Sequence, residues 1–116
     1  MTQIDIFRRS RDAVLVPAGD ILFREGEVGE IMIAIADGTI ELRHGGTVLE
    51  TIGPGGIIGE MALIDSLPRS ATAIAATDAR IVRVDRAHFT YLVQEHPTFA
   101  LQVMAVMAER LRRANG

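Results

Sequence analysis

From residue 13 to residue 84 the chain consists of short apolar runs separated by glycine, proline and aspartate. Runs at 13–16 and 21–23 are too short for helices and flank a turn-like Pro-Ala-Gly-Asp. Residues 31–36 are apolar at every position, as expected for a strand buried on both faces, whereas residues 39–43 alternate. About eight such strands at close spacing favour a sandwich, jelly roll or small barrel.

After Asp85 the pattern changes to helical spacing. Asp85 is a good N-cap for a helix with apolar residues on one face over 89–93, and Pro97 suits the first position of the next helix. The last helix, to about Ala114, is apolar almost all round over 99–108. Such a helix must bury more than one side, one against the strands and the other against a second copy or as a moving lid.

Residues 1–12 carry Ile4 and Phe7 at helical spacing beside three arginines, which predicts a short, half-docked helix with a solvated basic side. The whole chain, 1–116, is therefore interpreted as one mainly β domain. Residues 12–85 would form an eight-stranded β-roll or jelly-roll barrel with a short helix inside the segment 57–71. Residues 86–114 would form two C-terminal helices.

Composition and net charge exclude several classes of function. The chain has 116 residues, 48% of them hydrophobic, which is room for one modest core. A net charge of -3 argues against a nucleic-acid binder, and the lack of cysteine excludes disulfides, iron–sulfur ligation and thiol catalysis. With no signal-peptide pattern and no apolar run of ~18 residues, a cytoplasmic location is the default expectation.

The segment 57–71 carries the chemistry. Gly59-Glu60 opens a brief apolar stretch that reads as one helical turn, and a tight reversal then leads to Pro68-Arg69-Ser70-Ala71. Free amides at a helix start, with a guanidinium brought back beside them, make a receptor for phosphate. Glu60 suits the helix start and supplies an acceptor for a sugar hydroxyl. Phosphate and hydroxyl sites side by side suggest a sugar phosphate, most simply a nucleotide.

These two motifs at this spacing closely resemble the phosphate-binding cassette of cyclic nucleotide-binding domains of the catabolite activator type. The resemblance extends from about Val14 to Leu111 and includes Gly-Glu-Val-Gly at 26–29, Asp-Gly at 37–38 and Gly-Pro-Gly at 53–55. It implies a regulatory sensor in signal transduction, with cyclic AMP or cyclic GMP as ligand. Met32 and Ile58 stand where many family members have aromatic residues, a difference that concerns packing.

The resemblance assigns roles to the cassette residues. Arg69 would grip the cyclic phosphate, Glu60 the ribose 2′-hydroxyl, and Gly59 would let the backbone approach the ligand. Amides of Met61, Ala62 and Ala71 would support the phosphate while their side chains point into the core. In the family, serine at the Ser70 position leans to cyclic AMP and threonine to cyclic GMP. The candidate ligand-binding residues are Gly59, Glu60, Met61, Ala62, Arg69, Ser70 and Ala71.

The nucleotide base is expected to lie against isoleucine and valine side chains of the barrel, beneath part of the last helix. Arg110 and Leu111 are candidate lid residues at a suitable depth. The interpretation favoured for this arginine cluster is simpler, a cationic helix end that complements the helix dipole. Closure of the C-terminal helices over the ligand would relay the signal.

An enzyme is not expected. His44, His88 and His96 are isolated in the sequence, so neither a metal site nor a Ser-His-Asp arrangement is predicted, and no catalytic residue is assigned. The main alternative is a family-like barrel without a ligand that serves as a scaffold for protein interaction or dimerisation. The expected partners are a cyclic nucleotide and a second copy bound through the last helix. DNA binding by this chain and a membrane span are not expected.

Overall fold

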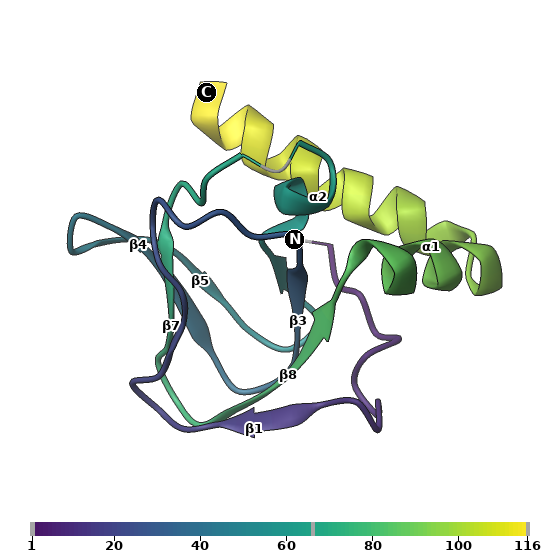
Figure 1. Cartoon of the computed structure of the whole chain (residues 1–116), viewed down its shortest axis with the longest axis horizontal. Helices are drawn as coiled ribbons and strands as arrows, with labels where there is room; N and C mark the ends of the chain where they lie inside the picture. Colours follow the sequence, from purple (N-terminus) through teal and green to yellow (C-terminus); the bar gives the residue numbers. More distant parts are fainter. Residues whose placement is uncertain (1, 66, 116) are drawn as a thin grey trace.

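The computed structural model describes residues 2–65 and 67–115, and within them eight strands form two four-stranded antiparallel sheets (Figure 1). The first sheet has the order β1 (Val14–Val16), β8 (Ala79–Val84), β3 (Met32–Asp37), β6 (Ile57–Ile58). The second has the order β2 (Ile21–Phe23), β7 (Thr72–Ala75), β4 (Ile40–His44), β5 (Thr47–Ile52). The predicted mainly β, jelly-roll-like architecture is confirmed.

Two apolar cores lie on opposite faces of the first sheet. One fills the space between the sheets and draws on seven of the strands; it includes Ile33, Ile35, Ile40, Ile52, Ile58 and Ile81. The other lies between the outer face of the first sheet and the helices; it includes Met32, Ile57, Leu63, Val84, Phe99 and Val103. The first sheet is therefore covered on both sides, while the second has one face in solvent.

Strand β3 is apolar at successive positions because both of its faces are buried. Successive side chains of a strand point to opposite faces, so Met32 and Ala34 enter the helical core whereas Ile33 and Ile35 enter the core between the sheets. All four residues are at most 1% exposed. Strand β4 is less buried, since Ile40 is 0% exposed, residues 41–43 are half-buried and His44 is exposed.

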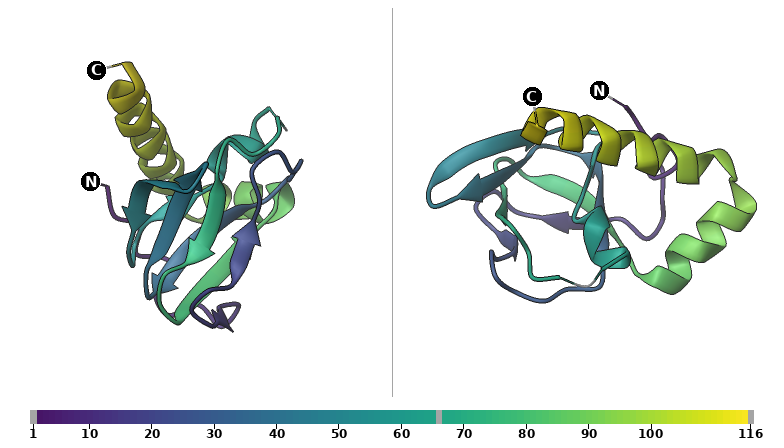
Figure 2. Two further views of the ribbon diagram at one scale, coloured as in Figure 1. Left: turned by 90° about the vertical axis from the view of Figure 1, so that its left-hand side faces the viewer. Right: turned by 90° about the horizontal axis from the view of Figure 1, so that it is seen from above.

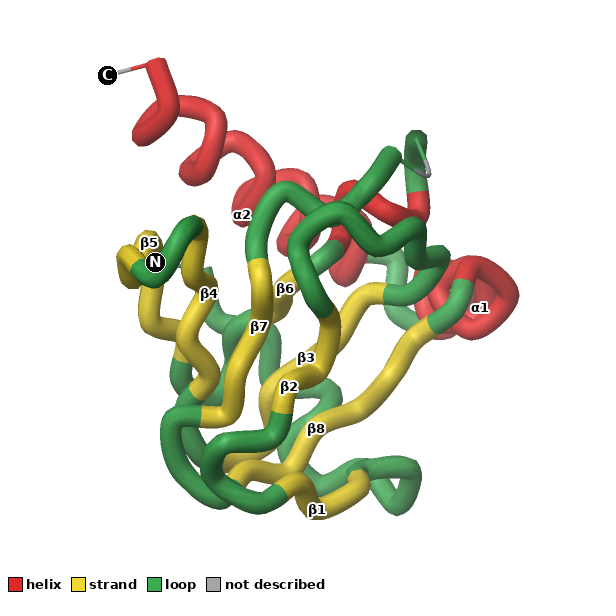
Figure 3. The backbone as a smooth tube through the Cα atoms, turned by 60° about the vertical axis from the view of Figure 1, so that its left-hand side comes forward, coloured by secondary structure: helices red, strands yellow, loops and turns green. Residues whose placement is uncertain are grey.

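Within residues 2–65 and 67–115 the helical elements are the 3-10 turn η1 (Glu60–Leu63) and the helices α1 (Arg86–Glu95) and α2 (Thr98–Asn115). Asp85 caps α1 as predicted, its carboxylate accepting a hydrogen bond from the His88 amide at 2.8 Å. Helix α2 is a long rod that passes over the strands (Figure 2), and the helices gather at one side of the strand layers (Figure 3). Within the described residues, no helix is long and apolar enough to cross a membrane.

The N-terminal segment differs from its prediction, because residues 6–9 form turns and no helix. Ile4 and Phe7 are only 1% and 4% exposed, and the Ile4 amide donates to the carbonyl oxygen of Gly55 at 2.7 Å. The segment is therefore held by two buried side chains and by backbone bonding to a loop of the β-roll, and these contacts do not require a regular helix.

The structure predicts that Phe99 anchors the helices to the strands. Its ring is fully buried and lies 5.7 Å from Phe7 and 5.3 Å from Phe89, measured between ring centroids. Phe99→Ala should lower the free energy of unfolding by about 3–5 kcal/mol, because it removes an aromatic ring from a packed core. Urea unfolding measures this loss. Tyr91→Ala is the matched control, since Tyr91 is 57% exposed. A similar small loss in both variants would contradict the assignment.

Candidate functional site

A pocket of about 300 Å³ lies where η1, the loop that follows it and α2 meet the strands. Glu60 and Arg69, nine positions apart in the sequence, both line it, as does Arg110 from α2. The remaining lining residues are Phe23, Leu42, Gly59, Met61, Ala62, Asp65, Leu67, Pro68, Ser70 and Ala71. All seven predicted ligand-binding residues are thus brought to one cavity.

Arg69 is a buried cation, only 8% exposed. Its Nη2 donates to the carbonyl oxygen of Ile31 at 2.9 Å and its Nη1 to that of Gly59 at 3.3 Å. The guanidinium carbon lies 4.2 Å from the centre of the Phe23 ring, a cation–π distance. The Nε atom is buried and has no hydrogen-bond partner among the described residues.

The turn at residues 26–29 fits around Arg69. The amide of Gly26 donates to the carbonyl oxygen of Arg69 at 2.8 Å, and the amide of Arg69 donates to that of Glu27 at 2.8 Å. A Cβ atom at Gly29 would lie 2.5 Å from Arg69 Nη2, so only glycine leaves room for the guanidinium. The glycines at 26 and 29, predicted as turn punctuation, thus also shape the site.

Gly59 is required for two reasons. Its φ of +71° is in the left-handed region, which favours glycine, and a Cβ atom there would lie 2.4 Å from Arg69 Nη1. The predicted role of Gly59, to let the backbone approach the ligand, stays a prediction. In the structure the group that this residue accommodates is the guanidinium of Arg69.

The charge of Arg69 is poorly compensated. Burial lowers the pKa of Arg69, and the nearby negative charges of Glu27 and Glu60 offset this only in part. Among the described residues no carboxylate lies within the 4.0 Å of an ion pair with it. A buried cation whose only direct acceptors are two carbonyl oxygens gains stability from an anion bound beside it.

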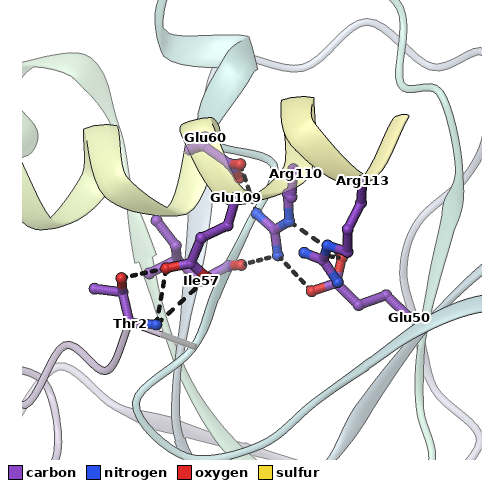
Figure 4. Close-up of polar contacts among 7 residues, drawn as sticks. All are labelled: Thr2, Glu50, Ile57, Glu60, Glu109, Arg110 and Arg113. Carbon is purple, nitrogen blue, oxygen red and sulfur yellow. Dashed lines mark hydrogen bonds and ion pairs between the residues drawn. The ribbon is translucent and has the colours of Figure 1, made fainter. Parts of the chain in front are cut away.

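Glu60 is the buried carboxylate of the pocket, only 3% exposed. Its Oε1 accepts a hydrogen bond from Arg110 Nη1 at 2.5 Å, so the cassette carboxylate is bound to helix α2 (Figure 4). The neighbouring residue of α2, Glu109, accepts hydrogen bonds from the amide and hydroxyl of Thr2. The hydrogen bond from the Thr2 hydroxyl is the main reason that the pKa of Glu109 is lowered.

Each guanidinium nitrogen of Arg110 donates at least one hydrogen bond. Its Nε and Nη2 each lie 3.2 Å from an oxygen of Glu50 on β5, and Nη2 also donates to the carbonyl oxygen of Ile57 at 2.7 Å. Burial acts to lower the pKa of Arg110, but the charge of Glu60 and the hydrogen bonds to Glu50 and Glu60 outweigh it, and the pKa is raised. The prediction of a simple cationic helix end is therefore wrong for Arg110. Leu111 is 63% exposed and does not line the pocket.

The predictions for the remaining cassette residues were correct in part. Ala62 and Ala71 are buried as predicted, but Met61 is 50% exposed, so the prediction that it points into the core is wrong. The amide of Ala62 already donates to the carbonyl oxygen of Gly59 at 3.2 Å. Ser70 is exposed and lines the pocket.

The apolar wall of the pocket also differs from its prediction. It consists of Phe23, Leu42 and Leu67 together with Met61, and none of the lining residues is an isoleucine or valine. The buried isoleucines and valines of the strands belong to the two cores.

Sequence reasoning missed three contributors to the site: Phe23, Gly29 as a contact of Arg69, and Glu50. Phe23 ends an apolar run and Glu50 is one acid in a short strand, so neither carries a local signal. The pair of glycines at 26 and 29 was the only hint that the sequence offered.

Known proteins resemble this chain in sequence and in fold. The model of the cyclic nucleotide-binding domain family matches residues 13–96. The cyclic AMP receptor protein of Thermus thermophilus is 34% identical over 106 residues, which are 87% of this chain and 49% of that protein. A cyclic nucleotide-gated potassium channel of Rhizobium etli is 36% identical over 107 residues, 92% of this chain and 30% of the channel. The structure of the Thermus thermophilus catabolite activator protein gives a TM-score of 0.78 at 33% identity, covering 89% of this chain and 51% of that one.

The chain belongs to the cyclic nucleotide-binding domain family. It spans about half the length, 49% and 46%, of the first curated relatives that it matches. These relatives are mostly regulators and channels, although a lysophospholipase also contains a matching region. The resemblance drawn from the cassette is confirmed, and the absence of enzymatic activity in this chain stays a prediction.

The contacts of Arg110 predict that this residue stabilises the fold. Arg110→Met keeps the aliphatic stem but leaves Glu60 without its ion-pair partner and Glu50 with only the weaker contact to Arg113, which should lower the free energy of unfolding by about 2 kcal/mol. Urea unfolding measures this difference. Arg112→Met is the matched control, because Arg112 is an exposed arginine on the same turn of α2. Equal stability of the two variants would refute the role.

Proposed function

We propose that this chain is a sensor module that binds a cyclic nucleotide monophosphate in the pocket between Glu60 and Arg69. One observation carries the proposal: a guanidinium that is 8% exposed lines the same cavity as a carboxylate that is 3% exposed, and no carboxylate pairs directly with that guanidinium among the described residues. A cation held in this way favours an anionic ligand, and the carboxylate supplies an acceptor for a hydroxyl on the same molecule.

A cyclic phosphodiester fits the cation. It carries one negative charge on two exocyclic oxygens, and a guanidinium can donate to both in parallel. The two carbonyl oxygens that hold Arg69 accept from different nitrogens, which fixes the plane of the group. The ribose 2′-hydroxyl of the same ligand would donate to Glu60. The backbone around Gly59 and Ala71, and the hydroxyl of Ser70, would complete the phosphate site.

The base would rest on the apolar wall made by Phe23, Leu42 and Leu67. Cyclic AMP is favoured over cyclic GMP, because Ser70 lines the pocket at the position where the family resemblance associates serine with cyclic AMP. The Thermus thermophilus relative is a cyclic AMP receptor protein, which supports the same preference.

Movement of the C-terminal helices would relay the binding event. The cassette is joined to them at three points: Leu63 packs in the same core as Phe99, Arg86 Nε donates to the carbonyl oxygen of Leu63 at 3.2 Å, and Arg110 pairs with Glu60. A ligand that draws the cassette inward would shift these contacts together. A differential affinity of a few kcal/mol between two helix positions suffices to change their populations.

Residues 1–116 would act as one regulatory module, with the β-roll at 12–85 and the helices at 86–114. No part of this chain, whose net charge is -3, would bind DNA, and a cytoplasmic setting is expected. A ligand-free scaffold is the rival function, and the underpaired cation at Arg69 counts against it.

Titration calorimetry with cyclic AMP and cyclic GMP tests the proposal. The wild-type chain should bind at micromolar concentration, and Arg69→Gln should weaken binding by at least about 100-fold, because it loses two charge-assisted hydrogen bonds worth about 1.5–3 kcal/mol each. Arg83→Gln is the matched control, since Arg83 is an exposed arginine on β8 and does not line the pocket. Far-UV circular dichroism verifies that both variants fold.

Absence of heat with either nucleotide at high micromolar concentration would favour the scaffold. Binding by Arg69→Gln with wild-type affinity would refute the phosphate role of Arg69 even if the nucleotide binds.

We also propose that two copies associate through the outer face of α2. Leu101, Met104 and Leu111 are 65%, 53% and 63% exposed, and with Ala108 they follow the alternating spacing of three and four residues of a coiled-coil seam. Such a stripe is self-complementary about a two-fold axis, so a second copy is the occupant that suits it.

Sedimentation velocity tests the dimer. The wild-type chain should sediment as a dimer at micromolar concentration, and Met104→Glu should convert it to a folded monomer because it places a charge in the centre of the seam. Tyr91→Glu provides the control, since Tyr91 is similarly exposed at 57% but lies on α1. A wild-type chain that is still monomeric at about 100 µM would exclude the seam as a dimer interface, because its association would then be weaker than about 5–6 kcal/mol.

A further inference from the structure

Two carboxylates share the guanidinium of Arg110. Glu60 comes from the cassette and Glu50 from the edge strand β5, and their side chains are 4% and 12% exposed. Figure 4 shows the arginine reaching from α2 between them, with Arg113 adding a second, weaker contact to Glu50 at 3.5 Å. The local charge is therefore nearly balanced, and each carboxylate has a cation within reach.

The two carboxylates use different parts of the guanidinium. Glu50 takes the edge formed by Nε and Nη2, with both of its oxygens engaged at 3.2 Å. This is the bidentate arrangement, in which two parallel N–H groups meet two carboxylate oxygens. Glu60 receives only Nη1, and only at its Oε1 oxygen. Within the described part of the chain, Glu60 Oε2 accepts no hydrogen bond.

We propose that Glu50 is a positioning residue for nucleotide recognition. By holding the bidentate edge of Arg110, Glu50 keeps the arginine from taking both oxygens of Glu60. One oxygen of Glu60 then stays available for the ligand's 2′-hydroxyl. The inference rests on the proposed function, because it concerns how Glu60 meets the ribose.

The consequence of losing Glu50 follows from geometry. A guanidinium pairs more strongly with a carboxylate through two parallel hydrogen bonds than through one. Without Glu50, the Nε and Nη2 edge has no carboxylate on β5, and Glu60 is the nearest other carboxylate of Arg110. Arg110 can then turn this edge to Glu60, and a 2′-hydroxyl would have to compete with an N–H group for the second oxygen.

The experiment compares cyclic AMP with its 2′-deoxy analogue in the wild-type chain and in Glu50→Gln. Glutamine keeps the size of the side chain but offers one acceptor oxygen and no charge, so it cannot accept both parallel N–H groups. The wild-type chain should prefer the ribose ligand by about tenfold or more, as expected for a hydrogen bond to a charged acceptor. In Glu50→Gln this ratio should fall toward one, mainly through weaker binding of cyclic AMP.

Two variants serve as controls. Glu41→Gln removes a carboxylate from the neighbouring strand β4, where Glu41 pairs with Arg43 at 2.5 Å, and it should leave the ratio unchanged. Glu50→Asp keeps the charge and both oxygens and should retain most of the preference. Together these variants separate a general loss of charge or of sheet stability from the specific loss of bidentate pairing.

Each result decides between the assignments. An equal loss of affinity for both ligands in Glu50→Gln, with the ratio intact, would show a merely structural role and overturn the inference. A wild-type ratio of one would instead overturn the ribose role proposed for Glu60, and a wild-type chain that binds neither ligand would overturn the proposed function itself. A ratio that falls in Glu50→Gln and is kept in Glu50→Asp is the result that we expect.

Discussion

The structure depends on burying the guanidinium of Arg69, which has no carboxylate at ion-pair distance among the described residues. Moving a cation out of water costs several kcal/mol even after relaxation, so the chain must supply compensation from several segments at once. Strand β2 offers the face of Phe23, and the backbone at Ile31 and Gly59 offers carbonyl oxygens. These contacts draw β2, the following turn and the cassette around one side chain. The compensation is incomplete, because burial lowers the pKa of Arg69 more than the charges of Glu27 and Glu60 raise it.

The two arginines of the pocket are stabilised in opposite ways after their removal from water. Arg69 is held by neutral dipoles and an aromatic face, and its pKa is lowered by burial. Arg110 has two carboxylates and a carbonyl oxygen, and its pKa is raised. The first arginine is suited to receive a charge from outside, whereas the second already has its charge satisfied within the protein. The pocket is therefore lined by one arginine with no ion-pair partner among the described residues and by a second that fastens α2 to β5 and the cassette.

The sequence predicted those parts that depend on local patterns. Short apolar runs indicated the strands, Asp85 indicated the start of α1, and the spacing of Glu60 and Arg69 indicated the cassette. The parts that it could not predict are side-chain contacts between distant positions, such as the Ile31–Arg69 and Glu50–Arg110 pairs, 38 and 60 residues apart. A single glutamate in a strand looks like any solvated residue until the fold places an arginine above it. The prediction of an N-terminal helix was wrong for a related reason. The burial of two side chains holds this segment in place, and their helical spacing in the sequence does not determine the backbone conformation.

Strand β3 contributes side chains to two separate interiors, and this has a consequence for how the domain can be altered. Helices grafted from one relative onto the β-roll of another would meet a strand whose opposite face was fitted to a different neighbour. Because close-packed interiors transmit small changes in volume, such a chimera would have to carry β3 along with the helices. The segment to exchange between relatives is thus the helices together with β3. A chimera joined at the helix boundary alone would separate side chains that pack together.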